Sequence, residues 1–229
     1  FKKLSSKEIL DASEIVYKDH YYNYIDDGIT INEPIINTVK NGKIHNIDLI
    51  IGSNNDEYSL YFGGIADVDG WLNAEVSDKQ KNKLTKLLSN IDDPIRKLDL
   101  LITAKNFVCP SLLIAKTVNL SGGNSWVYQF NRVRDDPKAL KYGAFHGAEL
   151  PYVFDTHDEW LPTNDIDRKI TEEVQSYWVQ FSKTGNPNLE QKMWDPYSAQ
   201  TNSTFIINEK SYSSSHPSYE ICKIMEPSW

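Results

Sequence analysis

One histidine in this sequence has mostly small neighbours. Residues 143–149 read GAFHGAE, so His146 is flanked by two glycines and two alanines. A histidine packed in a core usually has large apolar neighbours, whereas this one has space around it. Imidazole is the side chain that most often moves protons near neutral pH. We therefore interpret His146 as a candidate general base, with an ordinary loop or core histidine as the structural alternative.

Two acids follow an apolar run that is typical of a buried strand. Residues 47–53 read IDLIIGS, and the polar loop NNDE follows at 54–57. A second apolar run, 124–133, precedes His146. The carboxyl ends of parallel strands meet at one edge of a sheet, so we expect the acid and the histidine to lie close together. A carboxylate there would hold the imidazole in one tautomer. Glu57 and Asp56 are both candidates for this acid.

Helical patterns separate these strands. We expect helices over 5–16, 78–91, from 94 onward, 109–119 with Pro110 in the first turn, and 165–183, and a terminal helix in the tail from about 217. The 165–183 pattern repeats apolar residues at helical spacing, and Gly185 ends it. A third strand is expected at 205–207, and 20–47 reads as irregular. The alternation predicts an α/β fold with a mostly parallel sheet covered by helices.

Composition limits the partners of the chain. It has 229 residues, 40% hydrophobic, and a net charge of −8, which disfavours nucleic acid and anionic membranes as partners. No apolar run reaches the roughly 18–20 residues of a membrane span. Cys109 and Cys222 allow one disulfide or two buried thiols. Glycosylation sequons begin at Asn119 and Asn202, although such triplets often arise by chance.

An acid and a base require a nucleophile to complete a hydrolytic triad. In α/β-hydrolases the chain order is nucleophile, acid, histidine, so the serine is expected upstream of Glu57. The 229 residues contain neither a Gly-x-Ser-x-Gly elbow nor an HGGG-type oxyanion loop. Metal binding by His146 with Glu149, His157 or Asp158 is disfavoured, because there is no HExxH motif and no Cys/His cluster.

Several motifs in order make the chain resemble the type-B carboxylesterase/lipase family, which includes the cholinesterases. IGSNNDE at 51–57 is similar to the family's acid loop, G-x-N-x-D-E-G, and GAFHGAE at 143–149 to its histidine motif. The family's signature W-x-x-F-A-K-T-G-x-P-N is similar to residues 177–188, YWVQFSKTGNPN. Residues 106–110, NFVCP, also match the family. Tyr58 stands where the family usually has glycine, and Ser182 where it has alanine; neither change removes a functional group.

The resemblance implies a set of residue roles. Glu57 would be the triad acid and His146 the general base, with Asp56 and Glu149 supporting them, and Leu60 and Tyr61 would line the substrate pocket. Cys109 would pair with Cys222 in a disulfide, which implies an oxidising compartment and a secreted or periplasmic protein. No cofactor and no metal are implied.

The resemblance also implies a partner. Residues 1–229 would be the C-terminal portion of a single hydrolase domain, and an N-terminal half would carry the serine and the oxyanion hole. The expected substrate is a small carboxylic ester. The alternative is a non-catalytic, cholinesterase-like adhesion module, which would have lost its nucleophile.

Overall fold

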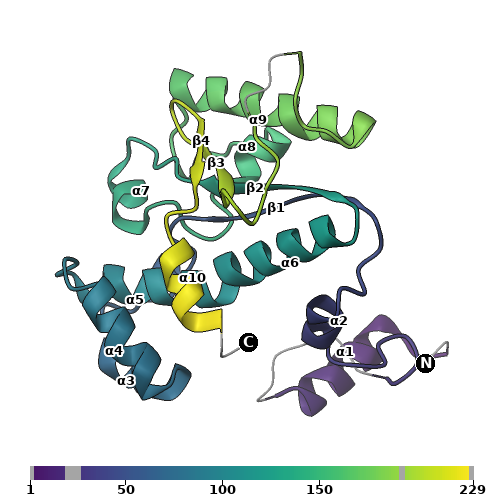
Figure 1. The fold of residues 1–229 in the computed structure, drawn as a ribbon, viewed down its shortest axis with the longest axis vertical. Coiled ribbons are helices and arrows are strands. Elements are labelled where there is room, and N and C mark those ends of the chain that lie inside the picture. The colour runs from purple at the N-terminus through teal and green to yellow at the C-terminus, as the bar shows by residue number, and fades with distance from the viewer. Residues whose placement is uncertain (1–2, 19–26, 191–193, 227–229) are drawn as a thin grey trace. The chain divides into compact units, whose positions relative to one another are not determined.

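The computed structural model describes residues 3–18, 27–190 and 194–226, and it divides into two units, Phe1–Thr38 and Val39–Trp229 (Figure 1). The first unit contains α1 (Ser6–Val16), which begins with a capping box. The Ser5 hydroxyl accepts from Glu8 N, and the Glu8 carboxylate accepts from Ser5 N at 2.7 Å. The helix predicted over 5–16 is confirmed. Residues 20–26 of the segment expected to be irregular lie outside the described ranges, and its described part, 27–47, contains the helix α2 (Ile35–Lys40).

A four-stranded sheet forms the centre of the second unit. Its strands are β1 (Asp48–Asn54), β2 (Asn124–Phe130), β3 (Ser203–Ile207) and β4 (Tyr212–Ser215), in the order β1-β2-β3-β4. β1, β2 and β3 are parallel, which confirms the mostly parallel sheet, and β4 is antiparallel to β3. β4 was not expected, since its sequence, YSSS, lacks the apolar residues that indicate a strand.

Helices and short helical turns connect the strands. They are η1 (Ser59–Tyr61), α3 (Val68–Glu75), α4 (Asp78–Leu87), α5 (Pro94–Thr103), η2 (Ala104–Val108), α6 (Cys109–Leu120), α7 (Pro137–Tyr142), α8 (Leu150–Phe154), α9 (Asp165–Thr184) and α10 (Tyr219–Met225). α9 matches the prediction closely. Asn164 caps it, and Gly185 ends it in the left-handed conformation with a φ of 75°.

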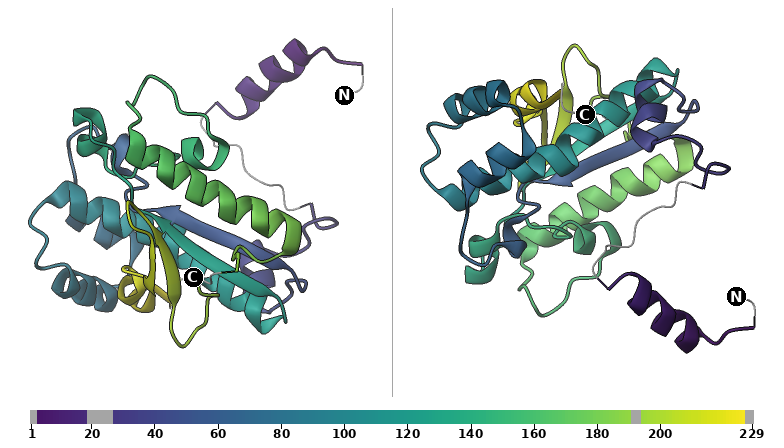
Figure 2. Two further views of the ribbon diagram at one scale, coloured as in Figure 1. Left: turned by 90° about the horizontal axis from the view of Figure 1, so that it is seen from above. Right: turned by 90° about the horizontal axis from the view of Figure 1, so that it is seen from below.

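The two faces of the sheet are covered by different helices (Figure 2). Val127 of β2 packs with α6 in one buried cluster, whereas Trp126 and Phe130 of the same strand pack with α9 in another. Alternate residues of a strand point to opposite faces, so a run of consecutive apolar residues marks a strand buried on both sides. This arrangement fixes the carboxyl ends of β1 and β2 in a rigid layer.

α5, η2 and α6 form one continuous helical run from Pro94 to Leu120, where two helices were expected. η2 is a π-helical turn, and it precedes Pro110, whose missing N–H interrupts the helical hydrogen-bond pattern. The sequence shows no uninterrupted apolar run of that length, but among the described residues this helical run alone is long and apolar enough to cross a membrane, with a mean hydropathy of 1.5 over its most apolar window. That window is 56% buried within the structure, and α6 contacts both β1 and β2, as a core helix does.

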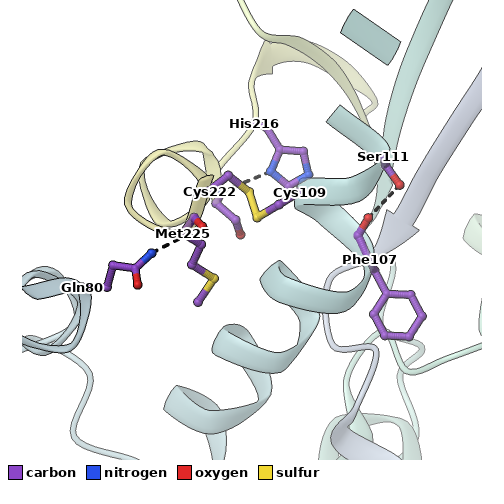
Figure 3. The surroundings of a disulfide bond; sticks show 8 residues. Gln80, Phe107, Cys109, Ser111, His216, Cys222 and Met225 are labelled. Carbon is purple, nitrogen blue, oxygen red and sulfur yellow. Dashed lines mark hydrogen bonds between the residues drawn. A yellow bond between two sulfur atoms is a disulfide. The ribbon is translucent and has the colours of Figure 1, made fainter. Parts of the chain in front are cut away.

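Cys109, at the start of α6, forms a disulfide with Cys222 of α10 (Figure 3). The pairing implied by the family resemblance is therefore present. Gln80 of α4 adds a second tie to α10, because its side-chain amide donates to the carbonyl of Ile224 at 3.0 Å. The C-terminal helix is thus attached both to the core helix and to α4.

Replacing both cysteines with alanine is expected to lower the free energy of unfolding by about 2–5 kcal/mol, because the bridge closes a long loop of the unfolded chain. The two cysteines are separated by 113 residues. Urea unfolding of the oxidised protein and the double variant measures the difference. Adding a reductant should destabilise the native protein and leave the variant unchanged. Equal unfolding midpoints for the two proteins would contradict the prediction.

His216 lies close to this disulfide and is 3% exposed (Figure 3). Its Nδ1 accepts a hydrogen bond from Ser218 N at 3.1 Å. Burial lowers the pKa of His216 to about 4, from an ordinary value of 6.5. The unfolded chain therefore binds a proton that the folded chain does not bind between these two pH values.

The contribution of His216 to stability is expected to be complete above pH 6.5 and to fall by about 3 kcal/mol as the pH drops toward 4. His216→Asn keeps an acceptor for Ser218 N–H but cannot titrate. Unfolding free energies measured from pH 7.5 to 4.5 should fall more steeply for the native protein than for this variant. Parallel curves would show that burial of His216 does not set the pH dependence.

Candidate active site

Glu57 lies in the loop that follows β1, and its side chain is only 5% exposed. β1 ends at Asn54, whose backbone N–H donates to Oε1 of Glu57 at 2.7 Å. Burial raises the pKa of Glu57, while the hydrogen bonds from Asn54 and His146 oppose that rise. The remaining oxygen, Oε2, faces His146.

His146 is joined to Glu57 across 89 residues of sequence. The distance from its Nδ1 to Oε2 of Glu57 is 2.7 Å, and its side chain is 51% exposed. Within the described part of the chain, its Nε2 has no hydrogen-bond partner. Phe107 of η2 packs against the imidazole, with ring centroids 5.5 Å apart. One ring nitrogen is therefore held on a buried carboxylate while the other remains available to a reacting group.

Asp56 joins the two loops through their backbones. Its N–H donates to the carbonyl of Ala144 at 3.0 Å, and Ala144 N donates to Oδ2 of Asp56 at 2.8 Å. Gly143 has a φ of +69°, and a Cβ on it would lie 2.4 Å from the same carboxylate oxygen. Glycine is thus required at this position both for its backbone conformation and for space. Asp56 contacts the histidine loop, and Glu57 contacts the imidazole itself.

Asn54 and Glu149 form a second connection between these loops. The Asn54 side-chain amide donates to the Phe145 carbonyl at 2.7 Å and also to the Glu149 carboxylate. Glu149 therefore supports the loop through Asn54, and its negative charge adds to the rise in the pKa of Glu57. The sequence placed Glu149 near the site but did not indicate a role for Asn54.

Arg96 and Asp99 of α5 also contact the acid loop. Asp99 is 2% exposed and accepts from Tyr58 N at 2.9 Å, and Arg96 forms ion pairs with both Asp99 and Asp56. Burial raises the pKa of Asp99 to about 6. Sequence reasoning missed this pair, because the sequence alone does not show that Asp99 is buried or that it contacts Tyr58.

Leu60 and Tyr61 lie on η1, just after the acid loop. Leu60 packs against the cluster that contains Phe145 and Leu161, behind the histidine loop. Tyr61 is 60% exposed, and its ring contacts Tyr58 at a centroid distance of 5.2 Å. Their place in a substrate pocket stays a prediction. The described residues contain no group of three or more His, Cys, Asp or Glu side chains that could hold a metal ion.

The chain is similar to known proteins over nearly its full length. The profile of the Carboxylesterase family matches residues 1–224. The chain is 28% identical over 197 residues to the para-nitrobenzyl esterase of Bacillus subtilis strain 168, which covers 80% of this chain and 39% of that protein. It is 25% identical over 221 residues to the Crystal protein of Dictyostelium discoideum, covering 87% of this chain and 39% of that one.

Solved structures share the fold. A PNB esterase structure superposes with a TM-score of 0.78 at 22% identity and covers 96% of this chain and 48% of that chain. The Geobacillus stearothermophilus carboxylesterase EST55 superposes with a TM-score of 0.78 at 20% identity, covering 97% and 49%. The fold is thus the α/β-hydrolase fold, and this chain spans about two-fifths of those two relatives and half of the solved chains.

Proposed function

This chain belongs to the carboxylesterase family, and we propose that it is the acid-and-base portion of a serine carboxylic-ester hydrolase. The observation that carries the proposal is the 2.7 Å contact between His146 Nδ1 and the buried Glu57 carboxylate. The segments that carry these two groups follow β1 and β2, which are parallel neighbours, so both groups lie at the carboxyl ends of these strands. A serine from an N-terminal half would complete the triad.

In the proposed reaction, the serine hydroxyl attacks the ester carbonyl carbon while His146 Nε2 takes its proton. The imidazolium is stabilised by Glu57 and then protonates the leaving alcohol, which leaves an acyl-enzyme. Water attacks the acyl-enzyme by the same route and releases the carboxylic acid. Because Nδ1 is occupied by Glu57, Nε2 of the half-exposed imidazole is the atom available for each proton transfer.

The free edge of β1 supports a partner half. In the described sheet, β1 pairs only with β2, so its other edge is open. A groove of about 450 Å³ runs beside this edge and is lined by Asp48 to Gly52 and by Trp178 and Phe181 of α9. A further parallel strand from the serine-bearing half would pair with β1 and cover these apolar side chains.

Two measurements test the function. The chain by itself should hydrolyse p-nitrophenyl esters at a negligible rate, because it lacks a serine elbow. The complete protein, with the upstream half, should turn over such esters and form a covalent serine adduct with a fluorophosphonate probe. Enzyme-like turnover by the 229-residue chain alone would overturn the assignment of the nucleophile to another segment.

A non-catalytic adhesion module is the second candidate function, because a nucleophile lost upstream leaves no trace here. The intact Glu57–His146 contact favours the enzyme, since an adhesion role does not require this pair. The fluorophosphonate probe separates the two functions. No adduct on the complete protein, together with tight binding of a protein partner, would support the adhesion module.

The disulfide supports the proposal of an oxidising compartment, such as the periplasm or the extracellular space. The sequons give no support to glycosylation. The Asn119 side-chain amide donates to the Tyr197 carbonyl at 2.8 Å, and Asn202 is 7% exposed. Neither amide is free at the surface of the folded chain.

A further inference from the structure

Arg134 is a buried cation whose partners are all neutral. It is 5% exposed, and its guanidinium donates to the Tyr152 hydroxyl, the Leu161 carbonyl and the Thr163 hydroxyl, and contacts Nδ1 of His157 at 2.9 Å. Within the described ranges, no carboxylate lies within ion-pair distance of it. A buried charge is costly unless an opposite charge accompanies it.

The neighbouring Arg132 shows the contrast. It pairs with Asp167 at 2.8 Å, Asp135 at 3.2 Å and Glu209 at 3.1 Å. Asp167 is fully buried, and it reaches Arg134 only indirectly, through the Tyr152 hydroxyl that donates to it at 2.7 Å. Arg132 is therefore neutralised by direct ion pairs, whereas Arg134 contacts no carboxylate directly.

His157 is a neutral partner of Arg134 and does not offset its positive charge. Its Nε2 lies 2.7 Å from the Thr171 hydroxyl, which itself donates to the Asp167 carbonyl. Nε2 is therefore the donor, and Nδ1 is a neutral acceptor for Arg134. Of the five N–H groups of Arg134, these four contacts use four, and one on Nη2 remains.

A cavity of about 160 Å³ adjoins this cation. Arg132 and Arg134 line it together with Trp160 and Leu161, and another wall is formed by Phe145 and Gly147 of the histidine loop. A liquid water occupies about 30 Å³, so the cavity suits a ligand of roughly five non-hydrogen atoms. Its lining combines the two arginines and one acid, Asp158, with mostly apolar residues.

We propose that this cavity binds a short aliphatic carboxylate of the size of acetate or propionate. The carboxylate would accept the remaining N–H of Arg134 and neutralise its charge, and the alkyl group would lie against Phe145 and Leu161. Asp158 also lines the cavity, but it is exposed and its carboxylate accepts from Trp160 N at 3.1 Å. It is the one acid placed to oppose binding.

The occupant would contact the histidine loop from behind. Phe145 and Gly147 flank His146, so a bound carboxylate would restrain the loop that carries the base. A carboxylate is also the acid product of ester hydrolysis, so this site could sense that product. This regulatory role rests on the proposed function, whereas binding itself does not.

Titration of the complete protein with [1-¹³C]acetate at constant ionic strength tests the site, with line broadening of the ¹³C signal as the readout. Saturable broadening is expected, and the neutral isostere acetamide at equal concentration should not reverse it. Arg134→Met should weaken binding at least tenfold. Arg168→Met is the matched control, because Arg168 is exposed and pairs with Asp155, and it should bind acetate as the native protein does.

Asp158→Asn keeps the proposal testable should Arg134→Met fail to fold. Removing this acid from the cavity wall is expected to tighten acetate binding severalfold. Non-saturable broadening, equal binding of acetamide, or an Asp158→Asn affinity equal to that of the native protein would overturn the proposal. None of these readouts requires esterase activity, so a failed esterase assignment and a failed site are distinguishable.

Discussion

Replacing His146 with glutamine in the complete hydrolase is expected to lower kcat by about four orders of magnitude. Glutamine has a similar size, and its amide can still hydrogen-bond to Glu57, but it cannot accept the proton of the serine. The Nε2 atom that we assign to every proton transfer is lost. Initial rates of p-nitrophenyl ester hydrolysis measure the effect, and the KM should change far less than kcat.

His45→Gln provides the control for this change. His45 is exposed and precedes β1, at the opposite end of that strand from the acid loop, and its replacement should leave kcat unchanged. A His146→Gln enzyme that kept a tenth of the native kcat would contradict the role of His146 as general base.

Replacing Glu57 with glutamine is expected to lower kcat by about three to four orders of magnitude. The amide fills the same space but carries no charge, so the imidazolium formed during attack loses its stabilising partner. An amide N–H facing Nδ1 also favours the wrong tautomer, in which Nε2 carries the proton and cannot act as a base. Steady-state rates of the complete protein measure the loss.

Asp56→Asn is the comparison that separates the two neighbouring acids. Asp56 binds Ala144 N and Arg96 rather than the imidazole, so we expect a smaller loss of kcat than for Glu57→Gln. The reverse ranking would assign the triad acid to Asp56. Thermal unfolding of both variants distinguishes a loss of chemistry from a loss of folded protein.

Local sequence patterns were sufficient to predict the main strands and the long helix of the fold that carries Glu57 and His146. β1 and β2 are short apolar runs, β2 mostly buried and β1 half-buried, and α9 has a cap at Asn164, an apolar stripe and a terminating glycine. Parallel strands meet at their carboxyl ends, and this rule, together with the motif resemblance, predicted that Glu57 and His146 would be neighbours. Their 2.7 Å contact agrees with that expectation.

The features that sequence reasoning missed depend on contacts between residues that are far apart in sequence. Asp99 acquires its role from Tyr58, which is 41 residues away in sequence, so no local pattern indicates it. β4 has a polar sequence and is held by its pairing with β3. Arg134 is one of several charged residues in a polar loop, and only folding reveals that it is buried without an acid.

The π-helical turn η2 makes the core helix intolerant of a change in length. Each residue of an α-helix advances the chain by about 100°, and a π-turn accommodates one residue more than a regular turn. Deleting a residue within Ala104–Val108 would restore regular α-helical winding and would rotate α5 relative to α6. Phe107 could then not lie over the imidazole while Cys109 kept its angle toward α10, so insertions and deletions should be excluded from this turn.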